Sequence, residues 1–230
     1  MAQSLLPEEP LHDWQLAPAD ARKLQAQLST QLVDEPLSLS DISLVAGVDV
    51  SVKDNVSRSA IVVMTFPEME VIEIERAVRP TDYPYVPTLL TFREGPVLLK
   101  AFAKLQNRPD VYLFDGMGRI HPRKAGIAAH MGLWLQAPTI GVGKSHLLGD
   151  YEPAGIEKGN YSPLFYKGQQ LGVVLRTRTK VKPVYVSAGN KMTLDSAIEI
   201  VMACTLKYRL PEPIRAAHNA AGDDDLEDGL

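Results

Sequence analysis

The chain has 230 residues, of which 45% are hydrophobic and 23% charged, a composition typical of one globular domain with a substantial core. Its single cysteine, Cys204, excludes an intrachain disulfide and favours a reducing compartment. No stretch approaches the ~20 apolar residues of a membrane span, and the N-terminus lacks the cationic and apolar regions of a secretory signal. We therefore expect a monomeric, cytoplasmic protein with no membrane partner.

Charge is distributed unevenly along the chain. The formal net charge is −4, but five of the 28 acidic residues lie in the stretch 223–228. The rest of the chain is close to neutral and can carry a local basic surface, so the net charge does not exclude nucleic acid as a partner. We expect one domain over residues 1–218 and an acidic, disordered tail over residues 219–230.

The first half of the chain predicts a helix from Pro18 to about Val33 and then three strands, Leu44–Val50, Ala60–Phe66 and Val71–Val78. Short turns join the strands, which is typical of an antiparallel meander. The first strand is almost entirely apolar, as in a strand covered on both faces. Asp49, near its end, therefore needs a partner or a metal ion.

A proline-rich loop, Tyr83–Pro87, separates the meander from a helix predicted from Glu94 to about Gln106. Proline makes the loop rigid, and its tyrosines could pack on the core or serve as a wedge or stacking surface against bases. An acidic residue at a helix N-terminus is favourable in any case. Glu94 alone therefore indicates no particular function.

Next comes a strand at Val111–Asp115, a helix at Lys124–Gln136 and a strand at Pro138–Val142. Strand, helix and strand in this order form a βαβ unit, so the two strands run parallel. Asp115 stands at the end of a buried strand and is followed by Gly116. It could cap the turn or bind a metal ion, and its own sequence context does not distinguish the two.

The remaining segments predict an irregular insertion and a mostly regular ending. We expect irregular chain over 150–168, two strands at Leu171–Arg176 and Val184–Val186, and a helix capped by Thr193 that ends near Thr205. The chain then breaks at 209–213, and the ordered part ends near His218.

Three acidic residues converge if the first and fourth strands are neighbours, as in a ribonuclease H-like fold: Asp49, Glu94 and Asp115. Clustered carboxylates repel each other unless a cation lies between them, and oxygen ligands favour Mg²⁺, or Mn²⁺ in its place, over zinc. Such an ion activates water and stabilises charge on a phosphodiester. Lys144, just after the fifth strand, could neutralise the same phosphate.

With these motifs in place, the sequence resembles the endonuclease V family, the deoxyinosine 3′ endonucleases. The resemblance covers roughly residues 20–218 and rests on five separated motifs in order: Val45–Ser51, Pro84–Pro96, Asp115–Arg123, Pro138–Ser145 and Arg209–His218.

The resemblance implies an α/β, ribonuclease H-like fold with a mixed central sheet, a three-strand antiparallel meander plus parallel strands, flanked by helices. It also implies a Mg²⁺-dependent DNA repair enzyme. Such an enzyme recognises deoxyinosine and hydrolyses the second phosphodiester bond 3′ to it, leaving a 3′-hydroxyl and a 5′-phosphate. DNA is the expected partner, and inosine-containing RNA stays open as a substrate.

By motif position, the resemblance makes Asp49 and Asp115 metal ligands and Glu94 the third acid, with His218 and Lys144 also in the catalytic site. Tyr85 would fill the gap left by a flipped-out base. The other residues expected to contact the DNA or the lesion are Pro87, Thr88, Leu90, Gly116, His121, Arg123, Gly141 and Leu147.

The sequence departs from the family pattern at four positions: Thr88 stands where glycine is usual, Met117 where histidine or glutamine is common, Gly143 where alanine is usual, and Asn190 where many members have histidine. None of these changes touches the three acids. Three alternatives remain open: another nuclease of the same fold, such as a junction resolvase; an endonuclease that prefers inosine-containing RNA; and a nucleic-acid-binding module without catalysis.

Overall fold

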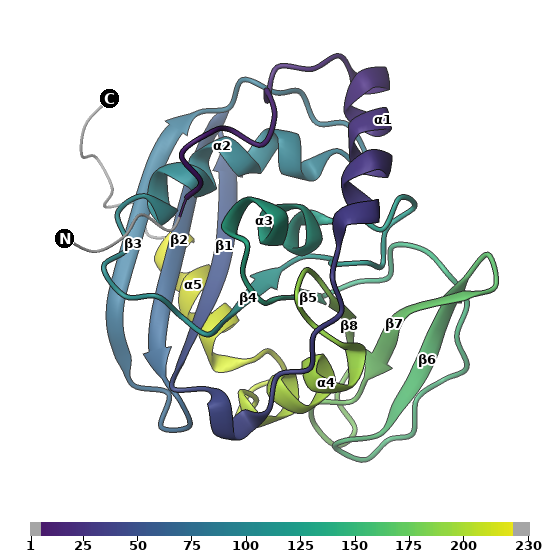
Figure 1. The fold of residues 1–230 in the computed structure, drawn as a ribbon. Helices are drawn as coiled ribbons and strands as arrows, with labels where there is room; N and C mark the ends of the chain where they lie inside the picture. Colours follow the sequence, from purple (N-terminus) through teal and green to yellow (C-terminus); the bar gives the residue numbers. More distant parts are fainter. Residues whose placement is uncertain (1–5, 223–230) are drawn as a thin grey trace.

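A computed structural model describes residues 6–222. One mixed sheet of eight strands runs through the molecule in the order β3-β2-β1-β4-β5-β8-β7-β6 (Figure 1). Its strands are β1 (Leu44–Lys53), β2 (Val56–Thr65), β3 (Val71–Pro80), β4 (Val111–Asp115), β5 (Thr139–Gly143), β6 (Tyr161–Tyr166), β7 (Gln169–Leu175) and β8 (Val184–Ala188).

The direction of the strands follows from their connections. β1, β2 and β3 form an antiparallel meander, whereas β1, β4 and β5 run parallel. Helices α2 and α3 precede the second and third of the parallel strands in the chain, and short turns connect the strands of the meander. The mixed sheet expected from the sequence is therefore confirmed, including the adjacency of the first and fourth strands.

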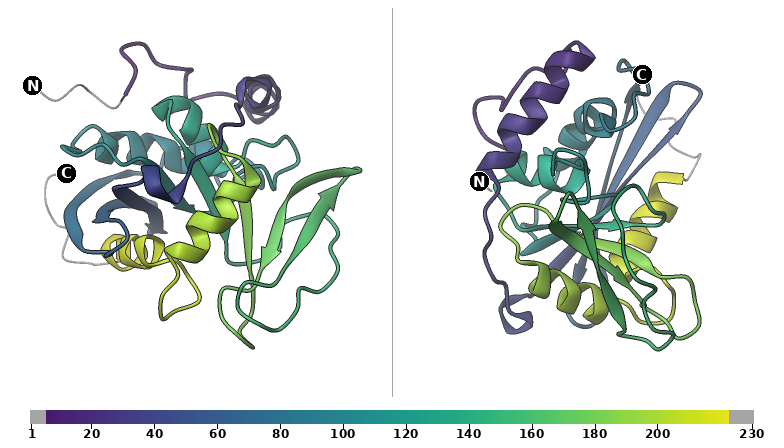
Figure 2. Two further views of the ribbon diagram at one scale, coloured as in Figure 1. Left: turned by 60° about the horizontal axis from the view of Figure 1, so that its bottom comes forward. Right: turned by 90° about the vertical axis from the view of Figure 1, so that its right-hand side faces the viewer.

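Helices cover both faces of the sheet (Figure 2). They are α1 (Pro18–Leu28), α2 (Leu90–Phe102), α3 (Ile127–Leu135), α4 (Leu194–Ala203) and α5 (Glu212–Gly222). Within residues 6–222, none of the helices is long and apolar enough to cross a membrane.

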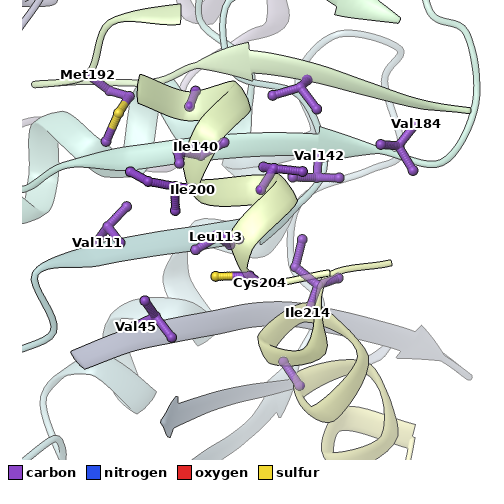
Figure 3. Packing of buried hydrophobic residues seen from close by; sticks show 14 of the residues in the cluster. Val45, Val111, Leu113, Ile140, Val142, Val184, Met192, Ile200, Cys204 and Ile214 are labelled. Atoms are coloured by element: carbon purple, nitrogen blue, oxygen red, sulfur yellow. The ribbon is translucent and has the colours of Figure 1, made fainter. Parts of the chain in front are cut away.

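Alternate residues of each central strand build two separate cores. Val45 of β1 packs with α4 and α5 on one face, and Figure 3 shows this core around Leu113, Ile140 and Ile200. The next residue, Ala46, points to the opposite face and packs with α2 and α3. Because a strand reverses its side chains at every residue, β1 needs apolar residues throughout its covered length.

Helix α5 approaches the sheet closely at one point. A side chain on Gly47 of β1 would place its Cβ 1.8 Å from the carbonyl oxygen of Pro213. Only glycine leaves room for this contact between two backbones. The contact brings the start of α5 against β1, directly beside Asp49.

Several predicted boundaries are wrong. Helix α2 begins at Leu90, before Glu94, because Phe92 and the preceding Leu89 are also buried. Helix α3 begins at Ile127, after Lys124, which has a φ of +53° and cannot continue a right-handed helix.

Two regions differ more strongly from the prediction. The stretch 150–168, expected to be irregular, contains β6, whose alternate residues Ser162 and Leu164 are buried. The chain also does not end its ordered part at residue 218, because α5 continues to Gly222 with Ala220 and Ala221 buried against the sheet. The rest of the expected acidic tail, residues 223–230, lies outside the described residues.

Candidate active site

Asp49 and Asp115 lie side by side where two parallel strands stop pairing. The pairing of β1 with β4 ends at Val48 and Phe114, so the next residue on each strand is an aspartate. Both side chains are only about one-tenth exposed, at 10% for Asp49 and 11% for Asp115. The predicted convergence of these two carboxylates is therefore seen in the structure.

His218 reaches the same place from α5. Its Nδ1 lies 2.7 Å from Oδ2 of Asp49. One ligand atom from each of Asp49, Asp115 and His218 lies within 4.8 Å of the others, so the three could hold one metal ion. The histidine side chain is 58% exposed, which leaves its outer edge open to solvent.

Lys144 provides a cation beside Asp115, whereas His218 lies beside Asp49. Its ammonium group forms an ion pair with Oδ2 of Asp115. The backbone of Lys144 is held by Arg209, whose Nη2 donates to the carbonyl oxygens of Lys144, at 2.7 Å, and Pro183, at 3.0 Å. Sequence reasoning assigned no role to Arg209, since no local pattern links it to a residue so far away in the chain.

Glu94 lies close to the two aspartates on helix α2, although it is outside the group that converges within 4.8 Å. The pKa of Glu94 is raised to about 8, mainly by burial and in addition by the charges of Asp49 and Asp115. A carboxyl group responds to these charges only when it is near them. The expected third acid is thus next to the pair.

The electrostatics of the site fit a bound cation. Burial raises the pKa of Asp49, and the charge of Asp115 acts in the same direction. The hydrogen bonds from His218 and the Val50 amide, together with Lys144, oppose this rise only in part. A hard divalent ion with oxygen ligands would remove the remaining repulsion, so the donor set present fits such an ion.

A pocket of about 300 Å³ opens beside the acidic residues. Besides Asp115 and Lys144, it is lined by six of the residues expected to contact the lesion: Tyr85, Thr88, Leu90, Gly116, His121 and Leu147. Pro87, Arg123 and Gly141 do not line it. Gly141 instead lets the turn after β4 pack on β5, since a Cβ there would lie 2.1 Å from the Gly118 nitrogen.

Arg123 and His121 both hold Thr88. Arg123 Nη2 donates to Oγ1 of Thr88 at 2.7 Å and to its carbonyl oxygen at 3.1 Å. His121 Nε2 lies 2.9 Å from the same carbonyl oxygen. Burial lowers the pKa of His121 to about 4, so this histidine is neutral near pH 7 and donates one proton. The expected contact of these two residues with the DNA or the lesion stays a prediction.

The structure accounts for two of the unusual positions. Thr88 has a φ of +71°, a conformation that favours glycine, and its contacts with Arg123 and His121 hold it there. Asn190 is buried, donates to the Gly132 carbonyl oxygen at 3.0 Å and accepts from the Val33 amide at 3.2 Å. Asn190 therefore joins parts of the scaffold and lies outside the site.

Helix α5 is the element of the site that the sequence did not predict. Its buried residues Ile214, Ala217 and Ala221 follow the spacing of one helical face. This pattern could have identified the helix, but alanines give a weak apolar signal after the prolines at 211 and 213.

Comparisons with known proteins identify the family of the chain. The family model described as Endonuclease V matches residues 26–219. The Endonuclease V of Nostoc sp. (strain PCC 7120) is 46% identical over 214 residues, which cover 92% of this chain and 97% of that protein.

Solved structures show the same fold. The crystal structure of Endonuclease V from Bacillus subtilis has a TM-score of 0.88 and 33% identity, covering 91% of this chain and 93% of that one. The Ciona intestinalis Endonuclease V (D234N), in complex with a 23mer DNA containing an inosine followed by a ribo-adenosine, has a TM-score of 0.77 and 32% identity. That match covers 88% of this chain and 94% of that one. The ribonuclease H-like fold expected from the sequence is thereby confirmed. The chain belongs to the Endonuclease V family and is a hydrolytic DNA endonuclease.

Proposed function

We propose that the protein is a Mg²⁺-dependent repair endonuclease that recognises deoxyinosine in DNA. It cleaves the second phosphodiester bond 3′ to the lesion and leaves a 3′-hydroxyl and a 5′-phosphate. The observation that carries this proposal is the position of the pocket. Asp115 belongs both to the buried aspartate pair and to the pocket wall, so the pair adjoins the pocket.

Asp49 and Asp115 would hold the metal ion, with Glu94 as the nearby third acid. When bound, the ion supplies an activated water and stabilises negative charge on the phosphate. His218 donates its Nδ1 proton to Asp49, which leaves Nε2 facing solvent as an atom that can orient a water molecule. Lys144 neutralises the phosphate from the side of Asp115.

The pocket would receive the flipped base. Tyr85 lines the pocket and, at 70%, is the most exposed large hydrophobic side chain within residues 6–222. A ring placed there can fill the gap left in the duplex, and stacking on a base contributes about 1–3 kcal/mol. The adjoining prolines at 84 and 87 keep the loop rigid.

The relative from Ciona intestinalis, solved with inosine-containing DNA, supports DNA as the substrate. Because the base in that DNA is followed by a ribonucleotide, it also keeps inosine-containing RNA as a second candidate substrate. We further propose that the protein acts as a monomer, since one chain supplies all the residues of the proposed site. A cytoplasmic location is also proposed, which the single cysteine fits.

The test is a duplex with one deoxyinosine, labelled at the 5′ end of the damaged strand. With Mg²⁺, we expect a single nick at the second bond 3′ to the lesion, with ends that DNA ligase can rejoin. EDTA should abolish the nick. Cleavage that is equal on the unmodified duplex, or a nick elsewhere, would contradict the proposal.

Two further substrates distinguish the alternatives. A four-way junction without inosine should stay uncut, since a resolvase would cleave it. An RNA of the same sequence with one inosine measures the preference between the two nucleic acids, and we expect faster cleavage of the DNA. Lesion binding without cleavage by the metal-loaded protein would indicate a binding module.

A further inference from the structure

Met117 and Gly143 face each other in the wall of the pocket. Met117 lies in the turn after β4, and Gly143 is the last residue of β5. A Cβ on Gly143 would lie 2.3 Å from Cε and 2.7 Å from Sδ of Met117, whereas the next atom is 3.7 Å away. The thioether of Met117 therefore occupies the space that an alanine side chain at 143 would need.

The backbone of Met117 cannot move to relieve such a contact. Its carbonyl oxygen accepts a hydrogen bond from the Ala128 amide at 3.1 Å. Gly126 also packs against it, because a Cβ there would lie 2.3 Å from the same oxygen. Only the side chain of Met117 can adjust, and methionine has three rotatable bonds for doing so.

The part of the pocket wall formed by Met117 can distinguish bases by their shape. A thioether is at most a weak acceptor, and the polar groups of the neighbouring Thr88 and His121 already bond to each other or to Arg123. At about 300 Å³ the pocket is at the small end of ligand pockets. The position of one flexible side chain then changes an appreciable part of the available space.

We propose that Met117 and Gly143 act as a coupled pair that sets the depth of the base pocket and thereby the range of purine lesions accepted. The thioether of Met117 forms this part of the pocket wall. Because Gly143 has no side chain, the thioether can occupy the space next to β5. This inference rests on the proposed function, since it assigns the pocket to the flipped base.

The experiment is a cycle of three variants, Gly143→Ala, Met117→Ala and the double variant, with single-turnover cleavage of a deoxyinosine duplex in Mg²⁺. We expect Gly143→Ala to lower the rate about tenfold, because the added methyl pushes the thioether into the pocket. The double variant should regain most of that loss, since no thioether remains to be displaced. Such non-additivity is the signature of two residues in contact.

Met117→Ala provides a second readout. A deoxyxanthosine duplex presents a purine with one additional exocyclic oxygen. We expect the ratio of its cleavage rate to that of deoxyinosine to rise about tenfold in Met117→Ala, because the deeper pocket tolerates the larger base. A purely structural role for Met117 would lower both rates together and leave this ratio unchanged.

Gly155→Ala is the matched control. A Cβ on Gly155 would also lie 2.3 Å from the end of a flexible side chain, Oδ1 of Asn160, and Gly155 does not line the pocket. It should cleave deoxyinosine like the wild type. The pair proposal is overturned if Gly143→Ala cleaves like the wild type, or if the double variant is no faster than Gly143→Ala. Failure of the wild type to cleave deoxyinosine would instead remove the proposed function and this inference together.

Discussion

Two clusters of titratable side chains are largely shielded from solvent, and burial shifts their pKa values in opposite directions. One is the acidic cluster, formed by Asp49, Glu94 and Asp115. The other is the histidine pair, formed by His12 and His130. Burial raises the pKa of Asp49 and Glu94 and lowers that of both histidines. Burial disfavours the charged form in each case, but the two clusters reach a stable state differently.

The histidine pair is stable because its members can be neutral. Nε2 of His12 lies 2.7 Å from Nε2 of His130 and accepts a hydrogen bond from Trp134 Nε1 at 3.1 Å. Since tryptophan only donates, Nε2 of His12 carries no proton and His130 must donate to it. Nδ1 of His12 then carries the proton and donates to the Asp13 carbonyl oxygen at 2.9 Å.

The two aspartates of the acidic cluster have no equivalent neutral arrangement. They converge at one edge of the sheet, and Lys144 with the hydrogen bonds from His218 and the Val50 amide offsets their charge only in part. A cluster that stays charged near pH 7 needs an additional cation. The histidine pair thus needs no added ion, although Nδ1 of His130 is buried without a hydrogen-bond partner among the described residues. The acidic cluster instead fits metal-dependent chemistry.

The strongest test of this difference removes one charge from the acidic cluster. Asp49→Asn and Asp115→Asn should each lower the cleavage rate about 10³-fold or more, because they remove a metal ligand and the charge stabilisation that it provides. Binding of the deoxyinosine duplex should persist in a gel-shift assay. Asp34→Asn, which changes an aspartate paired with Arg119 outside the site, is the control. Normal cleavage by either site variant would show that the metal assignment is wrong.

Lys144 tests the protein's own cation. Lys144→Ala should lower the single-turnover rate about 10²-fold, since it removes a positive charge next to the reacting phosphate. We expect a smaller effect on lesion binding, measured without metal. Lys23→Ala removes a lysine that is paired with Asp20 on the surface, and it should leave cleavage unchanged. Equal effects of the two substitutions would contradict a specific role for Lys144.

The stability of the metal-free protein should decrease as pH rises from about 5 to 8. Glu94 has a pKa of about 8 in the folded protein and an ordinary value near 4.5 when unfolded. Between these values the folded state binds more protons, so unfolding becomes easier as pH rises. We expect a loss of about 1–2 kcal/mol, less than the full pKa shift implies because the site opens to solvent.

Thermal unfolding in EDTA measures this slope. Glu94→Gln should flatten it, whereas Glu68→Gln, at an exposed turn, should leave it as in the wild type. Mg²⁺ should raise the melting temperature more at pH 8 than at pH 6, since protons and the ion compete for the same carboxylates. The same slope in Glu94→Gln and the wild type would exclude Glu94 as its source.

For the histidine pair we expect the opposite pH dependence of stability, and the smallest of these effects. Its folded pKa values lie below the ordinary 6.5, so the unfolded state binds more protons below that pH and stability falls on acidification. His130→Gln keeps a donor for His12 but does not titrate. We expect it to reduce the loss of stability between pH 6.5 and 5 by about 1 kcal/mol in urea unfolding. Identical acid slopes for variant and wild type would disprove the neutral pairing.

Local patterns in the sequence were sufficient to place the two aspartates. Val45–Val48 and Val111–Phe114 are apolar because they are covered on both faces of the sheet, and the first charged residue after each run therefore marks the edge of the sheet. The meander and the βαβ unit follow in the same way from turns and periodicity. These features depend on neighbours in the chain, which a single sequence displays.

Only the tertiary structure decided the rest of the site. His218 contacts Asp49 because α5 packs on Gly47. The thioether of Met117 packs next to β5 because Gly143 has no side chain. Each of these contacts joins segments that are separate in sequence. A shift of a few tenths of an ångström would change such a contact, and no local sequence pattern specifies positions so closely. The sequence by itself therefore determined which strands end in carboxylates, whereas the packing of helices and turns on those strands decided what surrounds them.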